Sequence, residues 1–345
     1  MLKDIKSLYL SELEKLLADE GYPKFRAGQV SLWLKKGVTS FDEMGNIPKD
    51  LREYLKRSCY ISVANIEKKL ISMYDGTVKY LFRLSDGECV ESVVMKYIHG
   101  YSICVSTQAG CKMGCSFCAT GRGGFARNLT PSEILSQIET AQKDLNIRIS
   151  NVVLMGMGEP LDNFDNVVRF LKIVSSEESL NIGLRHITLS TCGIVPKIYE
   201  LADLKMPVTL SVSLHAPDNE TRSKTMPINR KYPVEQLIKA CIYYFNTTKR
   251  RVSFEYAMIE DVNDSAENAK ALANLLSVMP CHVNLIPVNS VKGTLYRKSS
   301  VKRQKAFVEI LEKRGITATV RRTLGSDINA SCGQLRGKHK EEGGK

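Results

Sequence analysis

Hydrophobic residues in the first 60 positions recur at intervals of three and four, the spacing that places side chains on one face of a helix. One such face carries Leu10, Leu13, Leu16 and Leu17. A second segment is expected to bury Phe25, Val30, Leu32 and Trp33. The pattern therefore predicts short amphipathic helices in this region.

From Ile61 onward the pattern changes to short strand-like runs. Two of the connections carry Asp75-Gly76 and Asp86-Gly87, dipeptides that suit tight hairpin turns. We expect a meander of antiparallel strands that ends near Met95. Together with the helices it would form an N-terminal accessory domain over residues 1–96.

Beyond residue 100 short apolar runs alternate with helical patterns. Strands are predicted at residues 102–107, 151–156, 186–191, 208–215, 251–259 and 282–288. The clearest helix begins at Thr130, which can cap it, with Pro131 at the first helical position and Glu133 completing a capping box. Alternating strands and helices favour parallel βαβ units. The predicted fold class is therefore α/β, with a partial (β/α)6 barrel over residues 97–336 and a disordered tail over residues 337–345.

Composition narrows the functional class. No stretch reaches the roughly 18 consecutive apolar residues of a membrane helix, and the first residues alternate charged with apolar side chains, unlike a signal peptide. We expect a cytoplasmic protein with no membrane partner, acting as a monomer. Its 10 cysteines are then expected to be thiols, metal ligands or redox groups, because structural disulfides do not persist in a reducing compartment.

Positive charge is concentrated near the C-terminus. The chain has a net charge of +12, and the segment from Lys292 to Lys345 holds 14 basic against 5 acidic residues. A polyanion partner such as nucleic acid would explain a basic field confined to one segment. A solvated basic surface is the alternative that charge alone leaves open.

Several polar residues follow or close the predicted strands. In a parallel α/β barrel the functional groups lie at the carboxyl ends of the strands, so these residues are expected to surround one mouth. They are Gly156 to Pro160, Ser190 with Thr191, Ser213 to His215, Asn289 and a cysteine cluster. Taken singly each has a structural explanation, because the glycines can make a turn and His215 can be a satisfied buried histidine.

The segment CKMGCSFC, residues 111–118, places three cysteines within eight positions. A closed structural zinc site uses four ligands and would need a further one, such as Cys104. A cluster of four irons offers another solution, because three thiolates leave one iron open to an outside molecule. The spacing therefore favours an iron–sulfur cluster on Cys111, Cys115 and Cys118.

The C-x3-C-x2-C spacing, with Phe117 before the last cysteine, resembles the radical SAM superfamily. That resemblance implies a radical SAM barrel with a 4Fe-4S cluster on the three cysteines and S-adenosylmethionine on the open iron. It also implies that Gly158 and Glu159 hold the methionine amino group. The other implied cofactor contacts are Ser190, Val212, Ser213, Leu214, His215 and Asn289.

Longer stretches narrow the resemblance to the RlmN/Cfr family of RNA methyltransferases. They include QAGCKMGCSFCATG, MGMGEPLDN, SLHAPDNETRSKTMPIN and RRTLGSDINASCGQLR. Pro160, Pro287 and Arg322-Thr323-Leu324 fit the RlmN branch, which methylates adenine C2 in 23S rRNA (adenosine 2503) and in tRNA (adenosine 37). The Cfr branch, which methylates adenine C8 of 23S rRNA, is the alternative. A zinc-bearing RNA-binding module without catalysis is a second alternative.

The resemblance assigns roles to three residues outside the cluster. Adenine C2 is an electron-poor carbon that cannot attack a sulfonium methyl group, so the family carries the methyl on a protein thiol. Cys332 would receive a methyl group from one S-adenosylmethionine, and a second would supply the radical that activates it. Cys104 would release the product by forming a transient disulfide with Cys332, and Glu91 would accept the C2 proton. A flavodoxin-type protein is the usual electron donor for such clusters.

The residues themselves suggest an ordinary structural role for two of these positions. Cys104 lies in an apolar run and by default would be a small core residue. Glu91 as a lone carboxylate would be placed on the surface. Positive charge near Cys332 would favour a thiolate even without the resemblance. The remaining cysteines are expected to serve only in packing: Cys59, Cys89, Cys192, Cys241 and Cys281.

Overall fold

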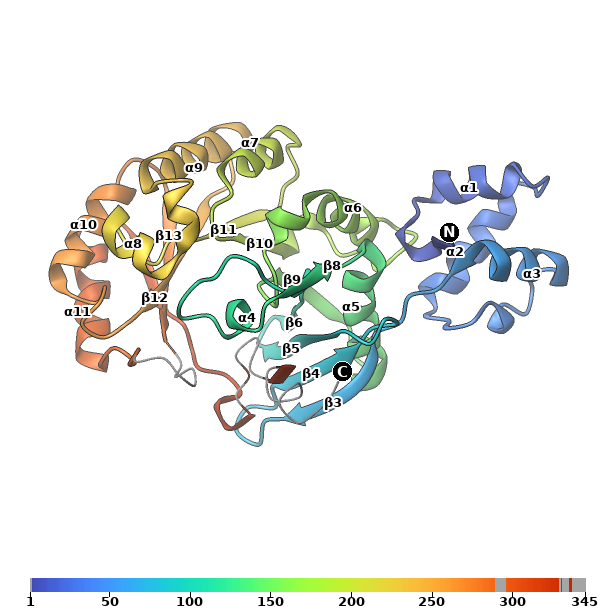
Figure 1. Cartoon of the computed structure of the whole chain (residues 1–345), viewed down its shortest axis with the longest axis horizontal. Coiled ribbons are helices and arrows are strands. Elements are labelled where there is room, and N and C mark those ends of the chain that lie inside the picture. The colour runs from blue at the N-terminus through green and yellow to red at the C-terminus, as the bar shows by residue number, and fades with distance from the viewer. Residues whose placement is uncertain (1, 289–295, 329, 331–334, 337–345) are drawn as a thin grey trace.

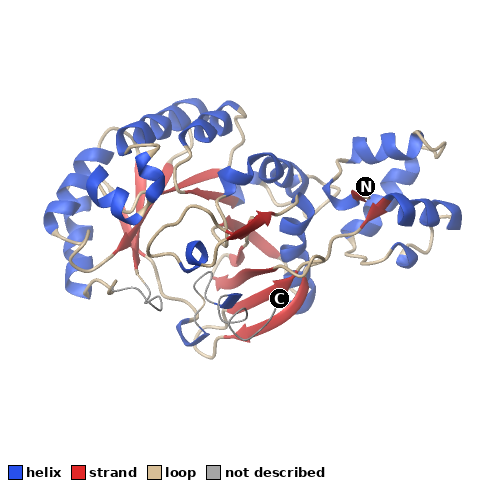
Figure 2. Ribbon diagram, viewed as in Figure 1, coloured by secondary structure: helices blue, strands red, loops and turns tan. Residues whose placement is uncertain are grey.

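The structure, a computed structural model, describes residues 2–288, 296–328, 330 and 335–336. Its central element is one sheet of 10 strands in the order β14-β13-β12-β11-β10-β9-β6-β5-β4-β3. The sheet curves, and helices cover its outer face (Figure 1). A separate group of helices stands beside it at the N-terminal end (Figure 2). Within the described residues the edge strands β3 and β14 do not pair with each other, so the barrel is open.

Neighbouring strands from β6 to β14 run parallel. They are β6 (Gly100–Cys104), β9 (Ile149–Leu154), β10 (Ile187–Thr191), β11 (Thr209–Ser213), β12 (Val252–Met258), β13 (Cys281–Pro287) and β14 (Thr317–Val320). The first six match the strands predicted from the sequence, which confirms the partial α/β barrel. The hydrophobic pattern does not predict β14, because only Ala318 of its four residues is buried.

Helices connect the parallel strands and bury their apolar faces against the sheet in one continuous core. They are α5 (Pro131–Leu145), α6 (Phe164–Ser175), α7 (Val195–Asp203), α8 (Asn219–Thr225), α9 (Val234–Thr248), α10 (Ala266–Leu276) and α11 (Val301–Glu312). α5 begins with the predicted capping box, in which Thr130 and Glu133 exchange side-chain to backbone hydrogen bonds. None of the described helices is both long and apolar enough to cross a bilayer.

The predicted meander is present, and it continues the barrel sheet. β3 (Asn65–Ile71), β4 (Val78–Arg83) and β5 (Cys89–Tyr97) are antiparallel, and β5 pairs in turn with β6. Tyr80 and Phe82 of β4 belong to the same hydrophobic core as the barrel strands. The domain boundary expected after residue 96 falls inside the β5–β6 hairpin, and the sheet and core continue across it.

The N-terminal helices have a hydrophobic core of their own. They are α1 (Leu10–Ala18), α2 (Phe25–Lys35) and α3 (Lys49–Ser58), which leads into β2 (Cys59–Tyr60). α1 buries Leu13, Leu16 and Leu17. These positions confirm the helical face predicted from the sequence.

The expected buried face of α2 is wrong at two positions. Phe25 and Leu32 are 58% and 60% exposed. The helix instead buries Ala27, Val30 and Leu34, which are three and four residues apart and share one face. Phe25 and Leu32 are seven residues apart and lie together on another face.

Asp4 attaches the N-terminal helices to the barrel. It lies in β1 (Lys3–Asp4), which pairs with β2. One of its carboxylate oxygens accepts hydrogen bonds from the hydroxyl groups of Ser7, Ser62, Thr130 and Ser132. Thr130 and Ser132 belong to the start of α5, so this carboxylate joins the two cores, as do the ion pairs of Lys6 with Glu139 and of Arg169 with Glu12.

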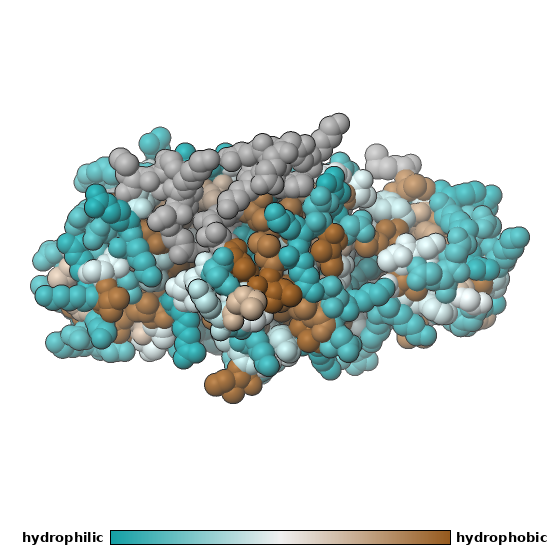
Figure 3. Space-filling model, turned by 90° about the horizontal axis from the view of Figure 1, so that it is seen from below, coloured by the Kyte–Doolittle hydropathy of each residue, from teal (hydrophilic) through white to brown (hydrophobic). Residues whose placement is uncertain are grey.

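Two hairpin turns of the meander expose apolar side chains. Met73 and Tyr74 lie between β3 and β4, and Ile98 lies between β5 and β6. On the face of the molecule shown in Figure 3, hydrophobic residues gather near the middle, between hydrophilic ends. Exposed apolar side chains therefore occur on this protein despite its high net charge.

Gln137 on α5 fixes the helix to β5 and to the residues that follow β6. Its fully buried side chain accepts hydrogen bonds from the Ser92 hydroxyl at 2.8 Å and the Ser106 N–H at 2.9 Å. Its amide group donates to the Ser106 carbonyl at 2.9 Å. This side chain thus helps to hold the backbone that leaves β6 toward the cysteine cluster, together with backbone hydrogen bonds to the end of β9 and the turn after it.

Replacement of Gln137 by Leu should lower the free energy of unfolding by about 2–4 kcal/mol, because buried polar groups of Ser92 and Ser106 lose their partner. Urea unfolding measures the change. Lys143→Gln, on the exposed side of the same helix, is the control and should change stability by less than about 0.5 kcal/mol. Equal effects of the two substitutions would contradict the assigned role of Gln137.

Candidate functional site

The carboxyl ends of the parallel strands surround a cavity of about 300 Å³. Residues that the sequence singled out line it together: Cys111, Cys115, Cys118, Gly158, Glu159, Ser190, Ser213 and His215. They come from the segments that close or follow β6, β9, β10 and β11. The parallel direction of these strands is what brings residues more than 100 positions apart to one place.

The three cysteines lie in a loop anchored on both sides. The loop leaves β7 (Gln108–Gly110), which pairs with β8 (Phe125–Asn128). At Gly110, where φ is +90°, an added Cβ would lie 1.9 Å from the Gly124 carbonyl oxygen, so the approach of the two strands requires glycine. On the other side, the Ser116 N–H donates to the Thr225 carbonyl of α8 at 2.9 Å. The loop is therefore fixed relative to the barrel.

Burial affects the protonation of the thiols in this loop, and so their ability to bind metal. Burial raises the pKa of Cys111 to about 12 and also raises the pKa of Cys115. The protein alone thus favours neutral thiols, whereas iron would stabilise the thiolates that bind it. In the described part of the chain, no three His, Cys, Asp or Glu side chains converge on a single ion position. A 4Fe-4S cube does not require that, because each cysteine binds a different iron, and the donor set fits such a cluster with one iron left open.

The turn after β9 packs directly against the chain that leaves β6. An added Cβ on Gly156 would lie 2.6 Å from the Val105 carbonyl carbon, and one on Gly158 would lie 2.6 Å from the Gln108 Cβ. Gly158 also has φ of +104°. The two glycines therefore allow a close backbone approach, and the Glu159 N–H completes it by donating to the Gln108 side chain at 2.9 Å.

Glu159 joins the ends of two strands beneath the cavity. One carboxylate oxygen accepts from the Leu161 N–H at 3.0 Å, and the other accepts from the Cys192 N–H at 2.7 Å, just beyond β10. Burial raises the pKa of Glu159, although these N–H donors oppose the shift. Its carboxylate is thus fixed in direction at the wall of the cavity.

His215 is both a satisfied buried residue and part of the cavity wall. Its Nδ1 accepts from the Ala257 N–H at 2.8 Å, so the ring is held in one orientation. Burial lowers the pKa of His215 to about 3, which keeps the imidazole neutral. The ring packs edge-on against Phe117 from the cysteine loop, with centroids 4.8 Å apart. His215 therefore helps to position that loop.

Two of the expected cofactor contacts do not line the cavity with their side chains. The side chains of Val212 and Leu214 are buried in the barrel core, on the side of β11 away from Ser213. Only their backbone could reach a ligand at the strand end. Asn289 lies outside the described residues.

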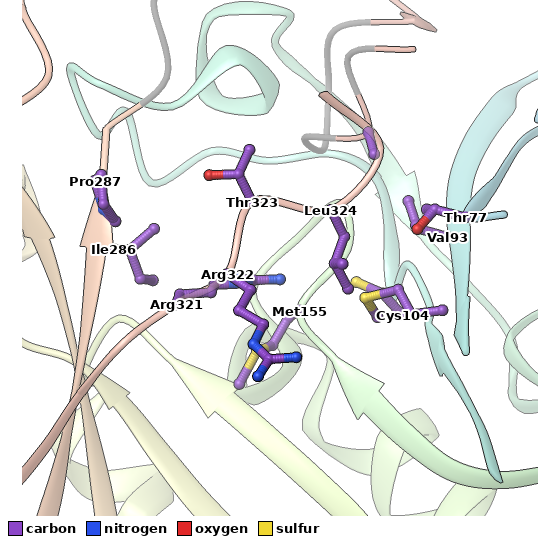
Figure 4. Close-up of a pocket in the computed structure, with 12 residues that line it drawn as sticks. Thr77, Val93, Cys104, Met155, Ile286, Pro287, Arg321, Arg322, Thr323 and Leu324 are labelled. Carbon is purple, nitrogen blue, oxygen red and sulfur yellow. The ribbon is translucent and has the colours of Figure 1, made fainter. Parts of the chain in front are cut away.

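A second cavity, of about 270 Å³, adjoins the first. The two share Met155, Ile286, Pro287 and Arg321 as lining residues. Figure 4 shows Arg321 and Arg322 between Ile286 on one side and Cys104 on the other. Positive charge and the buried sulfur of Cys104 thus face the same space.

Cys104 ends β6 on the face that lines this second cavity. It pairs with Val93 of β5 and packs with Val93 and Met95. No disulfide joins any two of the cysteines that the structure describes. Cys332, the expected partner of Cys104, lies outside the described residues. Its described neighbour Ala330 packs against the group that contains Cys104.

Glu91 is fully buried on β5, so its default assignment to the surface is wrong. One carboxylate oxygen lies 3.0 Å from the Lys79 ammonium, which is also buried, and the other accepts from the Arg336 N–H at 2.7 Å. The neighbouring Leu335 packs against Leu81 and Cys89 on the same face of the sheet. Described residues on both sides of positions 331–334 therefore lie over β4, β5 and β6.

Comparison with known proteins gives this geometry a context. Residues 105–273 match the radical SAM superfamily, and residues 3–61 match the ribosomal RNA large subunit methyltransferase N-terminal domain. A probable dual-specificity RNA methyltransferase RlmN from Clostridium novyi (strain NT) is 56% identical over 97% of this chain and 98% of its own length. A protein of the same name from Alkaliphilus oremlandii (strain OhILAs) is 54% identical over the same shares. The chain belongs to the RlmN family.

A solved structure agrees with the assignment to the RlmN family. The crystal structure of a radical SAM methyltransferase from Sphaerobacter thermophilus matches with a TM-score of 0.90 and 43% identity, covering 96% of this chain and 98% of that chain. The sequence resemblance and the expected fold class are thereby confirmed. A zinc-bearing module without catalysis does not agree with membership of a family of radical SAM methyltransferases.

The basic C-terminal segment of this RlmN-family protein is divided between two roles. Arg303 on α11 forms ion pairs with Asp261 at 2.6 Å and Asp264 at 3.0 Å, so its charge is used within the fold. Arg321 and Arg322 follow β14 and line the second cavity. Arg321 and Arg322 therefore place positive charge at the second cavity.

Sequence reasoning missed Glu255, a buried carboxylate in the wall of the first cavity. It lies on β12 and accepts from the Ser211 hydroxyl at 2.7 Å and the Asn284 amide at 2.8 Å. Its neighbours Phe254 and Tyr256 face the hydrophobic core. The alternation of that strand was the available signal that Glu255 points into the barrel.

Substitution of Glu255 tests this environment through pH. Burial raises the pKa of Glu255, so the folded protein favours the protonated form, and the stability this gives is lost as pH rises above the ordinary glutamate value. Glu255→Gln should therefore equal or exceed the unsubstituted protein in Tm at pH 8, and this relative advantage should shrink toward pH 4. Thermal unfolding across that range measures it.

A second variant should show the opposite effect of pH on the difference in Tm from the unsubstituted protein. Hydrogen bonds from its own backbone N–H and from the Ser265 hydroxyl lower the pKa of exposed Glu267 at the start of α10, so its contribution to stability is lost as pH falls. The Tm of Glu267→Gln should therefore fall below that of the unsubstituted protein at high pH. If the Tm of both variants changed with pH in the same direction relative to the unsubstituted protein, Glu255 would not be held in the buried environment described.

Proposed function

We propose that this protein methylates C2 of adenosine in structured RNA, at adenosine 2503 of 23S rRNA and adenosine 37 of tRNA, and that it does so as a cytoplasmic monomer. The observation that carries the proposal is the junction of the two cavities. One is lined by Cys111, Cys115 and Cys118, and the other by Cys104 and two arginines. Cofactor chemistry and a substrate that carries phosphate can meet at this junction.

The proposed cofactor residues combine the lining of the first cavity with the residues that the family resemblance implies. The three cysteines would hold one 4Fe-4S cluster. S-adenosylmethionine would contact Gly158, Glu159, Ser190, Ser213, His215 and Asn289, together with the backbone of Val212 and Leu214. When bound, these groups supply a methyl group and a radical, neither of which a side chain can provide. Two molecules of S-adenosylmethionine would be used for each methylated base, with an electron from a flavodoxin-type donor.

The second cavity has the properties of a site for an unstacked nucleotide. Arg321 and Arg322 supply positive charge for phosphate, and the apolar surfaces of Ile286 and Leu324 can pack against a base. An enzyme that reacts at a ring carbon must take the base out of its stack, so a recess beside the cofactor is required. The excess of basic residues near the C-terminus supports the same approach of RNA.

Cys332 and Cys104 would act in sequence on the sulfur that carries the methyl group. In the proposed route the carbon on Cys332 becomes bonded to adenine C2, which joins protein and RNA covalently, and C2 gives up its proton to a base. The Cys104 thiolate then attacks the Cys332 sulfur, an S–S bond forms, the S–C bond breaks, and the electron pair passes to the carbon that remains on the base, where a proton from solvent completes the methyl group. Ala330 beside Cys104 supports this, since it is two residues from Cys332.

Glu91 is the proposed acceptor of the C2 proton. Its carboxylate lies 3.0 Å from the ammonium group of buried Lys79, which fixes the side chain in place on β5. Its other oxygen is engaged by the Arg336 N–H. The proposal therefore requires this contact to open when RNA binds, so that the carboxylate reaches the base.

Cys111→Ala, Cys115→Ala and Cys118→Ala should each lose the cluster, because a cube held by only two thiolates exposes a further iron. Iron and sulfide content after anaerobic reconstitution, together with the visible absorption of the cluster, measure the loss. The matched control is Cys192→Ala, since Cys192 lines the same cavity but stands outside the motif. It should keep full iron content. A complete cluster in any of the three motif variants would sink the assignment.

Cys104→Ala should keep the cluster and the methylation of Cys332 but leave RNA covalently attached to the protein. A shifted band on a denaturing gel that disappears after ribonuclease treatment detects the adduct, and a second substitution at Cys332 should abolish it. Cys89→Ala, on β5 of the same sheet, is the control and should release product. Normal turnover of Cys104→Ala without an adduct would assign Cys104 to packing alone.

Methylation at C8 in the product would favour the Cfr alternative.

A further inference from the structure

Arg222 on α8 is the bulkiest of the fully buried side chains that the structure describes. A guanidinium group is always charged, and its burial is costly unless a carboxylate compensates it. Among the described residues, no carboxylate forms an ion pair or a hydrogen bond with Arg222. Burial lowers the pKa of Arg222, so its surroundings oppose the charge.

The hydrogen bonds of Arg222 all go to neutral acceptors. Nη2 donates to the carbonyls of Cys192 at 2.6 Å and Ser213 at 3.2 Å, and Nε donates to Leu214 at 3.1 Å. Nη1 donates to the Asn229 side chain at 2.9 Å. The guanidinium thus joins the carboxyl ends of β10 and β11 immediately behind the cavity. Neutral donors could hold these carbonyls equally well, so the hydrogen bonds do not explain a charge.

The same short helix also holds the cysteine loop. Arg222 enters the core from α8, and three residues later the Thr225 carbonyl accepts hydrogen bonds from the Ser116 N–H and hydroxyl. Ser116 lies between Cys115 and Cys118. The position of the buried charge is therefore fixed relative to the cysteines by a single turn of backbone.

We propose that Arg222 is a positioning residue that serves as the internal counter-charge of the cluster on Cys111, Cys115 and Cys118. Three thiolates give a bound cluster negative charge, and each added electron increases it. A fixed positive charge behind the cavity then stabilises the holoprotein over the apoprotein and the reduced cluster over the oxidised one. The inference rests on the proposed cluster, and it concerns a residue that touches none of the reacting atoms.

The charge can be separated from the hydrogen bonds by two substitutions. Arg222→Gln removes the charge and keeps a donor, whereas Arg222→Lys keeps the charge and loses the planar fork. The control is Arg250→Gln, because Arg250 donates to the Thr209 hydroxyl at the opposite end of β11. Each protein is compared as apoprotein and as reconstituted holoprotein by thermal unfolding, and the reconstituted cluster is titrated against potential by electron paramagnetic resonance.

The Arg222→Gln apoprotein should be at least as stable as the unsubstituted apoprotein, because a costly buried charge is gone. Its gain in Tm on cluster binding should be smaller. At a fixed potential the ratio of reduced to oxidised cluster should fall at least tenfold, which corresponds to about 59 mV for one electron. Arg222→Lys and Arg250→Gln should keep the ratio of the unsubstituted protein.

A purely structural role predicts a different result. In that case Arg222→Gln lowers the Tm of apoprotein and holoprotein equally and leaves the reduction potential unchanged, which would overturn the proposal. If Arg222→Gln does not fold, the redox titration of Arg222→Lys tests the proposal instead. A shifted reduction potential in Arg222→Lys, which retains the charge, would also overturn the proposal. Failure of the proposed function is recognised separately, because the unsubstituted protein would then not form a cluster on reconstitution.

Discussion

The candidate site depends on the two different pairings of β6. This strand is antiparallel to β5 on one side and parallel to β9 on the other, with Cys104 opposite both Val93 and Val153. The antiparallel side brings in Glu91, and the parallel side sets the edge where the cysteine loop and the turn after β9 meet. A slip of one residue between β5 and β6 would turn every side chain of one strand to the opposite face, so this register fixes Glu91 and Cys104 on one surface.

Residues far from the cofactor loops take part in the same constraint. Gln137 fixes the chain just after β6, and the glycines after β9 allow the two strand ends to approach. Glu159 and Arg222 extend the arrangement across β10 and β11 through backbone groups. The cavity is thus defined by hydrogen bonds between strand ends, and the lining side chains project from a frame that is already set.

Much of this could be read from the sequence, and the reasons for the rest are physical. Periodicity predicts the six barrel strands and the meander, and the rule for parallel strand ends predicts which residues gather at one mouth. Periodicity fails at Phe25 and Leu32 because two apolar faces compete on one short helix. It cannot find Arg222, since an arginine on a helix is ordinarily exposed and its burial depends on tertiary contacts. The buried state of Glu91 likewise depends on Lys79 and on a segment 245 positions away.

The C-terminal segment has its contacts in the first third of the chain. Gly325 N–H binds the Asp75 carboxylate across 250 positions, Asp327 binds Met73 across 254, and Arg336 binds Glu91 across 245. During synthesis the sheet that receives this segment emerges from the ribosome long before the segment itself does. The surface around Glu91 and Cys104 is therefore completed only after residues 330–336 have been synthesised. A chain that ended at residue 321 would retain β14 and the strands before it but would lack the Arg336 N–H that binds the Glu91 carboxylate.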